Sequence, residues 1–221
     1  MKQAPKDYSH LLAGALNATC GISWSIAYVL YVKQAQRDHS YGMPLAALLL
    51  NFTWEFVYTF LQPVHGIGRV THFPWLFLDS QLLLLTIQNG PHMWKESSPL
   101  IAENFLPISI VGGLLALSAQ WTFSKQFINH NPSFWSAYMC QNIISWGSIL
   151  MLLSRGNCSG HSLPIWFFRF AGSLAANLRY LYRAYAWPQR YEFILGGFTI
   201  WLLWMPTLAD LIYVLTFKIV N

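Results

Sequence analysis

Two carboxylates, Glu55 and Asp210, lie inside long apolar stretches of the chain. An ionised carboxylate near the centre of a bilayer costs about 2.5 to 3.5 kcal/mol on insertion scales, so acids at that depth usually serve chemistry or transport. Desolvation penalises the charged form of a carboxyl group, which can therefore keep its proton at neutral pH and donate it. If the two acids face one cavity, one can act as a general acid while the other supports it.

Polar and aromatic side chains share the helical faces of these acids. Helix neighbours lie three and four residues apart, which places Asn51 and Tyr58 beside the first acid and Tyr213 beside the second. Aromatic faces such as those of Trp54 and Tyr58 can stabilise a carbocation by roughly 2 kcal/mol or more when desolvated. A protonated acid in a dry aromatic pocket suits a lipid-soluble polyene, so these four residues are predicted to bind substrate.

Arg169 and Asp79 complete the set of candidate substrate-binding residues. Arg169 lies well inside an apolar segment, and a buried cation needs a partner, for which Asp210, Glu55 or an anionic group of the substrate could serve. Asp79 is expected near the start of a helix, where a membrane interface could solvate it and a structural role is favoured.

The elements that carry these residues are predicted from composition and from the length of the apolar segments. With 55% hydrophobic, 17% aromatic and 10% charged residues, the chain departs from the roughly 25% charged residues of soluble proteins. Each apolar segment is close to the ~20 residues that span a bilayer as a helix. They cover residues 8–32, 42–62, 70–89, 105–124, 132–153, 161–183 and 194–217. We therefore expect an all-α, polytopic transmembrane bundle of about seven helices, forming a single domain over residues 1–221.

Two details of these helices are specific enough to predict. Pro206 lacks an amide hydrogen, so it frees the carbonyl of Leu202 and tends to kink the last helix. The polar residues 1–7 lead into the first segment without a small-residue cleavage site, which predicts a retained helix rather than a signal peptide.

Charge and cysteine content disfavour several classes of protein. The net charge of +5 is scattered over the loops without the basic stripe that follows a phosphate backbone, so no nucleic-acid partner is expected. The three cysteines form no C-x-x-C pair, and neither a disulfide framework nor a metal site is indicated. The chain also lacks the D-D-x-x-D cluster that binds magnesium and the D-x-D-D run of soluble protonation-type cyclases. Any acid catalysis must come from isolated acids on separate helices, without a metal or another cofactor.

Four runs and one dipeptide, collinear over almost the whole chain, resemble the fungal membrane-bound meroterpenoid and indole-diterpene cyclases. The runs are QRDHSYGM at residues 36–43, NFTWEFVY at 51–58, LSRG at 153–156 and WFFRFAGS at 166–173, followed by Trp187 and Pro188. The second run is the most specific of them. The resemblance implies a small seven-helix membrane terpene cyclase of secondary metabolism that needs no metal.

In that family, the acid of the second run and an aspartate in the last helix form the catalytic pair, which here correspond to Glu55 and Asp210. The resemblance implies that Glu55 protonates the terminal epoxide of a prenylated aromatic or polyketide, with Asp210 in support, whereas some relatives protonate an alkene. It also implies a lipophilic substrate, a lipid environment and a multi-pass location in the endoplasmic reticulum. The number of subunits is left open.

The main alternative is a small proton-coupled transporter. In that protein, Glu55, Asp210 and Arg169 would form a proton relay across the membrane. Uptake driven by a pH gradient would favour the transporter, whereas product formation without a gradient would favour the cyclase.

Overall fold

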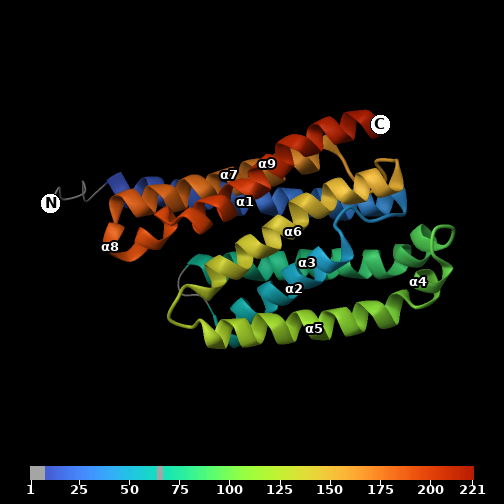
Figure 1. Ribbon diagram of the computed structural model, residues 1–221, viewed down its shortest axis with the longest axis horizontal. Helices are drawn as coiled ribbons and strands as arrows, with labels where there is room; N and C mark the ends of the chain where they lie inside the picture. The colour runs from blue at the N-terminus through green and yellow to red at the C-terminus, as the bar shows by residue number, and fades with distance from the viewer. Residues whose placement is uncertain (1–7, 64–66) are drawn as a thin grey trace.

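The computed structural model describes residues 8–63 and 67–221, and over these residues the chain is helical and contains no strand (Figure 1). Its long helices are α1 (Tyr8–Asp38), α2 (Leu45–Phe56) with the π-helical extension η1 (Val57–Leu61), α3 (Ile67–Trp94), α5 (Phe105–Gln126), α6 (Pro132–Arg155), α7 (Leu163–Ala186) and α9 (Gly197–Val220). The short elements are α4 (Pro99–Glu103), α8 (Pro188–Tyr191) and the 3-10 turn η2 (Glu192–Leu195).

These seven long helical segments confirm the predicted all-α bundle of about seven helices. The first segment is helical from Tyr8, as expected, whereas the prediction for residues 1–7 falls outside the described part of the chain.

Three helices of the described chain are long and apolar enough to cross a membrane by length and composition, and these spans are His10–Asp38, Phe105–Gln126 and Gly197–Val220. A shorter apolar helical stretch runs over Leu45–Leu61. On α5, large apolar side chains such as Val111, Leu114 and Leu115 are exposed. An apolar face of this kind suits contact with lipid, because water would penalise it.

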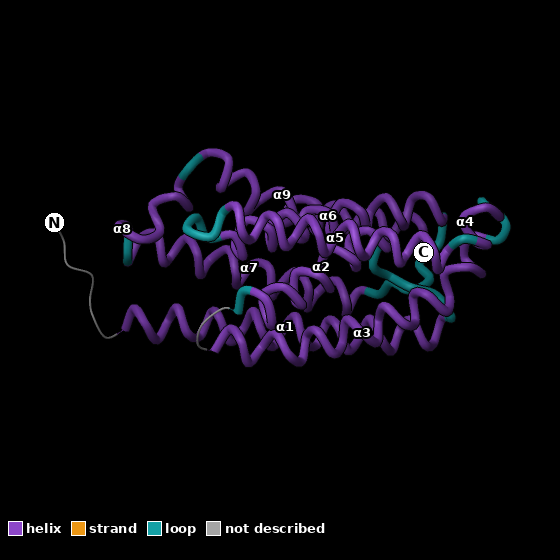
Figure 2. The backbone as a smooth tube through the Cα atoms, turned by 90° about the horizontal axis from the view of Figure 1, so that it is seen from below, coloured by secondary structure: helices purple, strands orange, loops and turns teal. Residues whose placement is uncertain are grey.

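The long helices form two groups that α6 connects. In Figure 1, α1, α7 and α9 run together in one group, and α2, α3 and α5 run together in the other. The helix α6 contacts α9 on one side and α2 on the other, and α1 packs against both α7 and α3. Figure 2 shows the same elongated bundle from below, with α4 and α8 at its two ends. The acid of α2 and the acid of α9 therefore lie on different sides of α6.

A buried apolar cluster joins the two groups of helices. It contains Tyr31 of α1, Leu48 of α2, Leu82 of α3, Ile144 of α6 and Ile165 of α7. Because five helices contribute to it, burial of this cluster fixes their spacing around the polar side chains described below.

Pro206 in α9 has no N–H to donate to the carbonyl oxygen of Leu202, and a side chain of another helix donates to that oxygen instead. Helix α9 continues through Pro206, and the Nδ2 of Asn142 in α6 donates to the carbonyl oxygen of Leu202 at 3.2 Å. At the next residue, the Nδ2 of Asn177 in α7 donates to the carbonyl oxygen of Leu203 at 2.9 Å. The predicted free carbonyl is confirmed, and it serves to tie α9 to α6.

Residues 36–43 and 153–156 meet at the end of the bundle opposite α8 (Figure 1). The backbone N–H of Gly160 donates to Asp38 at 2.8 Å, and Nη1 of Arg155 donates to the carbonyl oxygen of Tyr41 at 2.7 Å. A Cβ atom on Gly42 would lie 1.9 Å from the carbonyl oxygen of Gly160, which itself has φ of +81°. We call these five residues the clasp. Two of the runs noted in the sequence thus hold the ends of α1 and α6 together.

Candidate active-site cavity

A cavity of about 940 Å³ lies between α1, α2, α3, α6, α7 and the segment from Trp187 to Tyr191. Its lining on α1 extends from His10 to Tyr28, which are eighteen residues apart and therefore about 27 Å apart along the helix axis. Ring-bearing side chains dominate the wall around α2, and these are Trp24, Tyr28, Trp54, His72, Trp75, Phe134 and Tyr138. The cavity is therefore long and aromatic, which suits an extended apolar chain.

Glu55 lies in this wall with only 1% of its surface exposed. The hydroxyl of Tyr28 donates to Glu55 Oε1 at 3.1 Å, and the Nδ2 of Asn51 lies 2.6 Å from the Tyr28 hydroxyl and 2.8 Å from Asp79 Oδ2. Asn51 Nδ2 carries two hydrogens, so these two short contacts use both of its donors. One oxygen of Glu55 is thereby held, whereas Oε2 makes no hydrogen bond among the described residues.

Asp79 belongs to the same acid cluster, which contradicts the expectation that a membrane interface solvates it. Helix α3 already begins at Ile67, so Asp79 lies in the helix interior and is fully buried. Its described side-chain partner is Asn51, which also faces Glu55. Asp79 lies outside the cavity lining and reaches the cavity through Asn51.

The two aromatic candidates on α2 and η1 lie at different depths. Trp54 lines the cavity, and its indole N–H donates to the carbonyl oxygen of Ser133 at 3.2 Å. Tyr58 lies behind it, with 5.3 Å between the ring centres, and its hydroxyl accepts from Ser136 at 3.3 Å. Tyr58 is thus a support for the wall rather than part of it. A π-helical turn of the kind that begins at Val57 often occurs beside functional sites.

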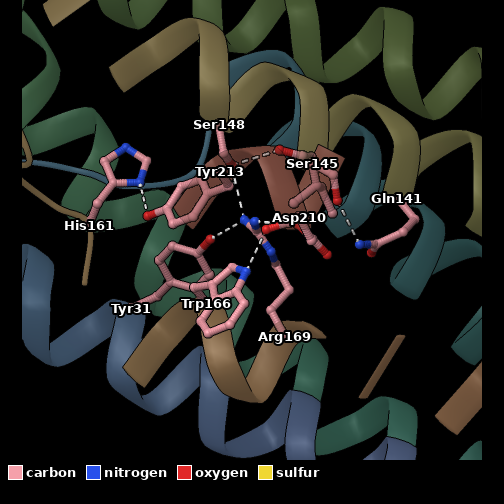
Figure 3. A network of polar contacts seen from close by, with 10 residues as sticks. Tyr31, Gln141, Ser145, Ser148, His161, Trp166, Arg169, Asp210 and Tyr213 are labelled. Atoms are coloured by element: carbon pink, nitrogen blue, oxygen red, sulfur yellow. Dashed lines mark hydrogen bonds and ion pairs between the residues drawn. The ribbon is translucent and has the colours of Figure 1, made fainter. Parts of the chain in front are cut away.

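Asp210 is held in a second network of polar side chains, which Figure 3 shows. Arg169 Nη2 and Asp210 Oδ1 form an ion pair at 2.6 Å, and at most 1% of either side chain is exposed. Nη1 of Arg169 also lies 3.0 Å from the hydroxyls of Tyr31 and Ser148. Of the partners that the sequence left open for Arg169, the structure gives Asp210.

Tyr213 belongs to this second network as well. Its hydroxyl lies 3.1 Å from Nδ1 of His161, and its ring centre lies 5.2 Å from the guanidinium of Arg169. The indole N–H of Trp166 donates to the backbone carbonyl of Asp210 at 2.7 Å. Arg169, Asp210 and Tyr213 all lie outside the cavity lining.

Helix α6 provides a polar link between the two networks. Gln141 lines the cavity, and its Nε2 donates to Ser145 Oγ at 3.0 Å. Figure 3 shows Ser145 beside Asp210. Of the candidate residues, the structure brings Asn51, Glu55 and Trp54 to the cavity, with Asp79 and Tyr58 behind its wall. The others form the second network, and they are Arg169, Asp210 and Tyr213.

Several cavity residues were missed from the sequence. Tyr28 donates a hydrogen bond to Glu55. In a single sequence it is one tyrosine in an apolar segment, and nothing marks it as a partner of Glu55. Arg179, Arg183 and Arg190 also line the cavity. The spacing of four between Arg179 and Arg183 places them on one helical face, and this signal was available.

The thiols and the possible metal ligands add little to the site. Cys20, Cys140 and Cys158 are free, and Cys20 lines the cavity. Over residues 8–63 and 67–221, no group of three or more His, Cys, Asp or Glu side chains is placed to hold a metal ion.

Comparison with known proteins gives a match over the whole chain. The sequence model of the Pyr4-like transmembrane terpene cyclases matches residues 1–221.

Individual relatives are similar over three quarters or more of their length. The Pyr4-family terpene cyclase mfmH of Annulohypoxylon moriforme is 36% identical over 215 residues, covering 96% of this chain and 88% of that protein. Terpene cyclase macJ of Penicillium terrestre is 34% identical over 217 residues, covering 96% and 84%. Asnovolin H synthase nvfL of Aspergillus novofumigatus is 34% identical over 190 residues, covering 80% and 75%.

Proposed function

The chain belongs to the Pyr4-like transmembrane terpene cyclases, and from this premise we propose that Glu55 starts the cyclisation by protonating a substrate in the aromatic cavity. The protein is a membrane enzyme that cyclises a lipophilic terpenoid. The observation that carries the proposal is a buried carboxyl group in the cavity wall, with one oxygen held by Tyr28 and the other without a partner among the described residues. Such a group can meet the substrate at a fixed position.

The chemistry needs only a proton and a protected cation. Glu55 gives its proton to the oxygen of a terminal epoxide, the C–O bond at the more substituted carbon breaks, and successive double bonds attack the resulting cation. Loss of a proton from carbon then ends the cascade, so the product is an isomer of the substrate. In the alkene variant, the proton of Glu55 adds to a carbon atom instead. Neither route requires a metal or another cofactor.

The aromatic wall supports this role because a cation in water would be quenched. The rings of Trp24, Trp54, Trp75 and Phe134 line the same cavity as Glu55. Each face can stabilise a desolvated cation by about 2 kcal/mol, and a dry cavity prevents capture by water.

The remaining candidate residues have supporting roles in the proposal. Asn51 and Asp79 orient Glu55 through Tyr28. The amide of Asn51 donates to Asp79 and to the Tyr28 hydroxyl, and that hydroxyl donates to Glu55. Asp210 acts as a positioning residue. Its ion pair with Arg169 holds α9 against α7. Ser145 of α6 lies beside Asp210 and accepts a hydrogen bond from Gln141, so the position of α9 affects a residue of the cavity wall.

At the level of the whole protein, we take residues 1–221 as one cyclase domain that crosses the endoplasmic reticulum membrane several times. The substrate class is a prenylated aromatic or polyketide of meroterpenoid secondary metabolism. Asnovolin H synthase, by its name, makes a specific product, and the other relatives named above are cyclases. These names disfavour the proton-coupled transporter.

The experiment uses purified protein in detergent with a chelator, so that neither a pH gradient nor a free metal ion is present. An epoxyprenyl aromatic incubated in D2O should give an isomer without carbon-bound deuterium after back-exchange. A prenyl aromatic that reacts by alkene protonation should instead gain one deuterium on carbon. Absence of any cyclised product from either substrate class, with folded protein, would contradict the proposal.

A further inference from the structure

We propose that Arg179, Arg183 and Arg190 form an anion-binding mouth of the cavity that holds the acidic head group of the substrate, with its prenyl chain directed toward Glu55. This inference rests on the proposed function of the cavity and names the class of substrate that it takes. The head group would be a carboxylate or an ionised enol or phenol.

Arg183 and Arg190 lie at one end of the cavity, and Arg179 lies one turn of α7 further in, where it contacts Asn17. Arg179 and Arg183 come from the last turns of α7, Arg190 comes from α8, and all three belong to the lining. At this end, the ring of His10 lies 4.9 Å from the ring of Trp187.

Glu55 lies at the other end of the cavity. Its partner Tyr28 is eighteen residues beyond His10, about 27 Å along the α1 axis. The cavity thus has a basic mouth and an acidic, aromatic inner end. A ligand with one polar end and one apolar end matches this polarity.

Tyrosine rings hold the arginines in a ladder. The guanidinium of Arg179 lies 4.6 Å from the ring centre of Tyr180, and that of Arg183 lies 5.8 Å from the same ring. Arg183 is also 5.4 Å and Arg190 5.6 Å from the ring centre of Tyr191. Stacking on an aromatic face leaves the in-plane N–H donors of a guanidinium available for a ligand.

The charges of this ladder are not balanced by carboxylates of the described chain. The ion pairs among the described residues are Arg37 with Asp38 and Arg169 with Asp210. None of the three mouth arginines takes part in them. Arg179 donates to Asn17, but its Nε is buried and has no partner among the described residues. Like charges in a partly desolvated space repel each other, and a bound anion removes that repulsion while accepting bidentate hydrogen bonds.

Two structural roles would also place arginines here. Cations in the last turn of a helix interact with its dipole, and basic residues near a membrane surface attract anionic lipids. Neither role requires the side chains to line the cavity that contains Glu55, as these three do. We therefore assign the anion to the substrate, and the test separates it from lipid.

The test measures binding, so that it does not depend on turnover. Two unreactive ligands with the same saturated prenyl chain, one ending in an aromatic carboxylate and the other in its methyl ester, are titrated against protein in nanodiscs of zwitterionic lipid. Quenching of tryptophan fluorescence gives the Kd, because Trp24, Trp54 and Trp75 line the cavity. The variants are Arg183→Gln with Arg190→Gln, the matching Lys pair, and Arg37→Gln as a control far from the cavity.

Loss of charge-assisted hydrogen bonds should weaken carboxylate binding by at least about tenfold in the Gln pair and change ester binding less than about threefold. The Lys pair should restore most of the carboxylate affinity, and Arg37→Gln should bind both ligands as the unaltered protein does. Equal losses for both ligands, or none, would overturn the inference.

A second set of nanodiscs with anionic lipid separates lipid from substrate. If the arginines bound only lipid phosphates, anionic lipid would stabilise the unaltered protein but not the Gln pair, and the carboxylate and ester would bind equally. That outcome would also overturn the inference. The result is independent of the role of Glu55, because the readout is binding of unreactive ligands and requires no proton transfer.

Discussion

Glu55 and Asp210 are both carboxyl groups inside apolar helices, but their partners differ. Glu55 meets neutral donors in the wall of a cavity, whereas Asp210 meets the guanidinium of Arg169 in a closed network. Asp210 Oδ1 lies 2.6 Å from the guanidinium of Arg169, and Asp210 does not line the cavity, so it is poorly placed to give a proton to a substrate there. The proton donor is therefore assigned to Glu55, and its neighbours on α1, α2 and α3 act by orienting it.

Asn51 gives a direct test of this orienting role. Asn51→Leu removes the amide that donates to Asp79 and to the Tyr28 hydroxyl, which in turn donates to Glu55, so the acid should lose its position relative to the substrate. We expect kcat to fall by about 10- to 100-fold, the usual cost of misplacing a reacting group, with less change in KM. Cyclisation kinetics measure this, and Asn129→Leu in an exposed loop is the control. An unchanged kcat would show that Glu55 needs no support from Asn51.

At the scale of the elements, α6 separates the two acids and connects their networks. It packs against α2 and α9, and it carries Gln141, Ser145 and Ser148 on the faces that meet the cavity and the Arg169 network. Contacts of α9 with α7 and α6 therefore influence the cavity without touching it. This arrangement supports the positioning role that we propose for Asp210.

The ion pair between α7 and α9 can be tested by a double-mutant cycle. Arg169→Leu and Asp210→Leu should each lower the free energy of unfolding in detergent by about 3 to 5 kcal/mol, because each leaves a buried charge unpaired. The double variant should recover part of the stability and part of the cyclase activity. Recovery of stability without any activity would instead place Asp210 in the chemistry.

The clasp makes a prediction about the other end of the bundle. Gly42→Ala puts a Cβ atom 1.9 Å from the carbonyl oxygen of Gly160, and the backbone must move. Overpacking of this kind costs about 1 to 3 kcal/mol, which should lower the unfolding temperature in detergent. Gly197→Ala has nothing within 4 Å of the new Cβ and should leave it nearly unchanged. Equal unfolding temperatures for Gly42→Ala and Gly197→Ala would show that the close contact between Gly42 and Gly160 is not needed for stability.

Much of the helical framework could be predicted from the sequence, because apolar length and proline positions mark the segments. The expected segment 132–153 corresponds to α6, Pro132–Arg155, which begins at its proline. The expected end of the first segment at residue 32 was too early, because hydropathy falls there while the helix continues to Asp38. Polar side chains in the last turns of α1 bond to one another, and Gln34 donates to Asp38 at 2.7 Å.

The site was only partly predictable, and the reason is helix adjacency. Spacing within one helix correctly grouped Asn51 with Glu55. The contacts of Glu55 with Tyr28, and of Asn51 with Asp79, join positions 27 and 28 residues apart and depend on which helices pack together. One sequence carries no information about that packing, and the same limit hid the separation of Glu55 from Asp210.

At the scale of the whole molecule, the bundle has two distinct ends. The end with α8 bears the mouth arginines, and the opposite end bears α4 and the clasp (Figures 1 and 2). A membrane protein with this arrangement should present its ends to opposite sides of the bilayer.

Sidedness can be measured with single cysteines. In a background with Cys20, Cys140 and Cys158 replaced by serine, Gln189→Cys lies at the α8 end and Glu103→Cys at the α4 end, both at exposed positions. In sealed microsomes, an impermeant thiol reagent should label one of the two variants, and permeabilisation should allow labelling of both. Labelling of both variants in sealed vesicles would contradict a bundle that spans the membrane end to end.

The most direct test of the central claim compares Glu55→Gln with Glu103→Gln. Gln keeps the shape of Glu55 and its contact with Tyr28 but has no transferable proton, whereas Glu103 lies exposed on α4. With an epoxyprenyl aromatic and folded, membrane-inserted protein, cyclisation by Glu55→Gln should fall by at least about 100-fold, the contribution of a general acid, and that of Glu103→Gln should stay normal. Cyclisation by Glu55→Gln at the normal rate would show that another group supplies the proton.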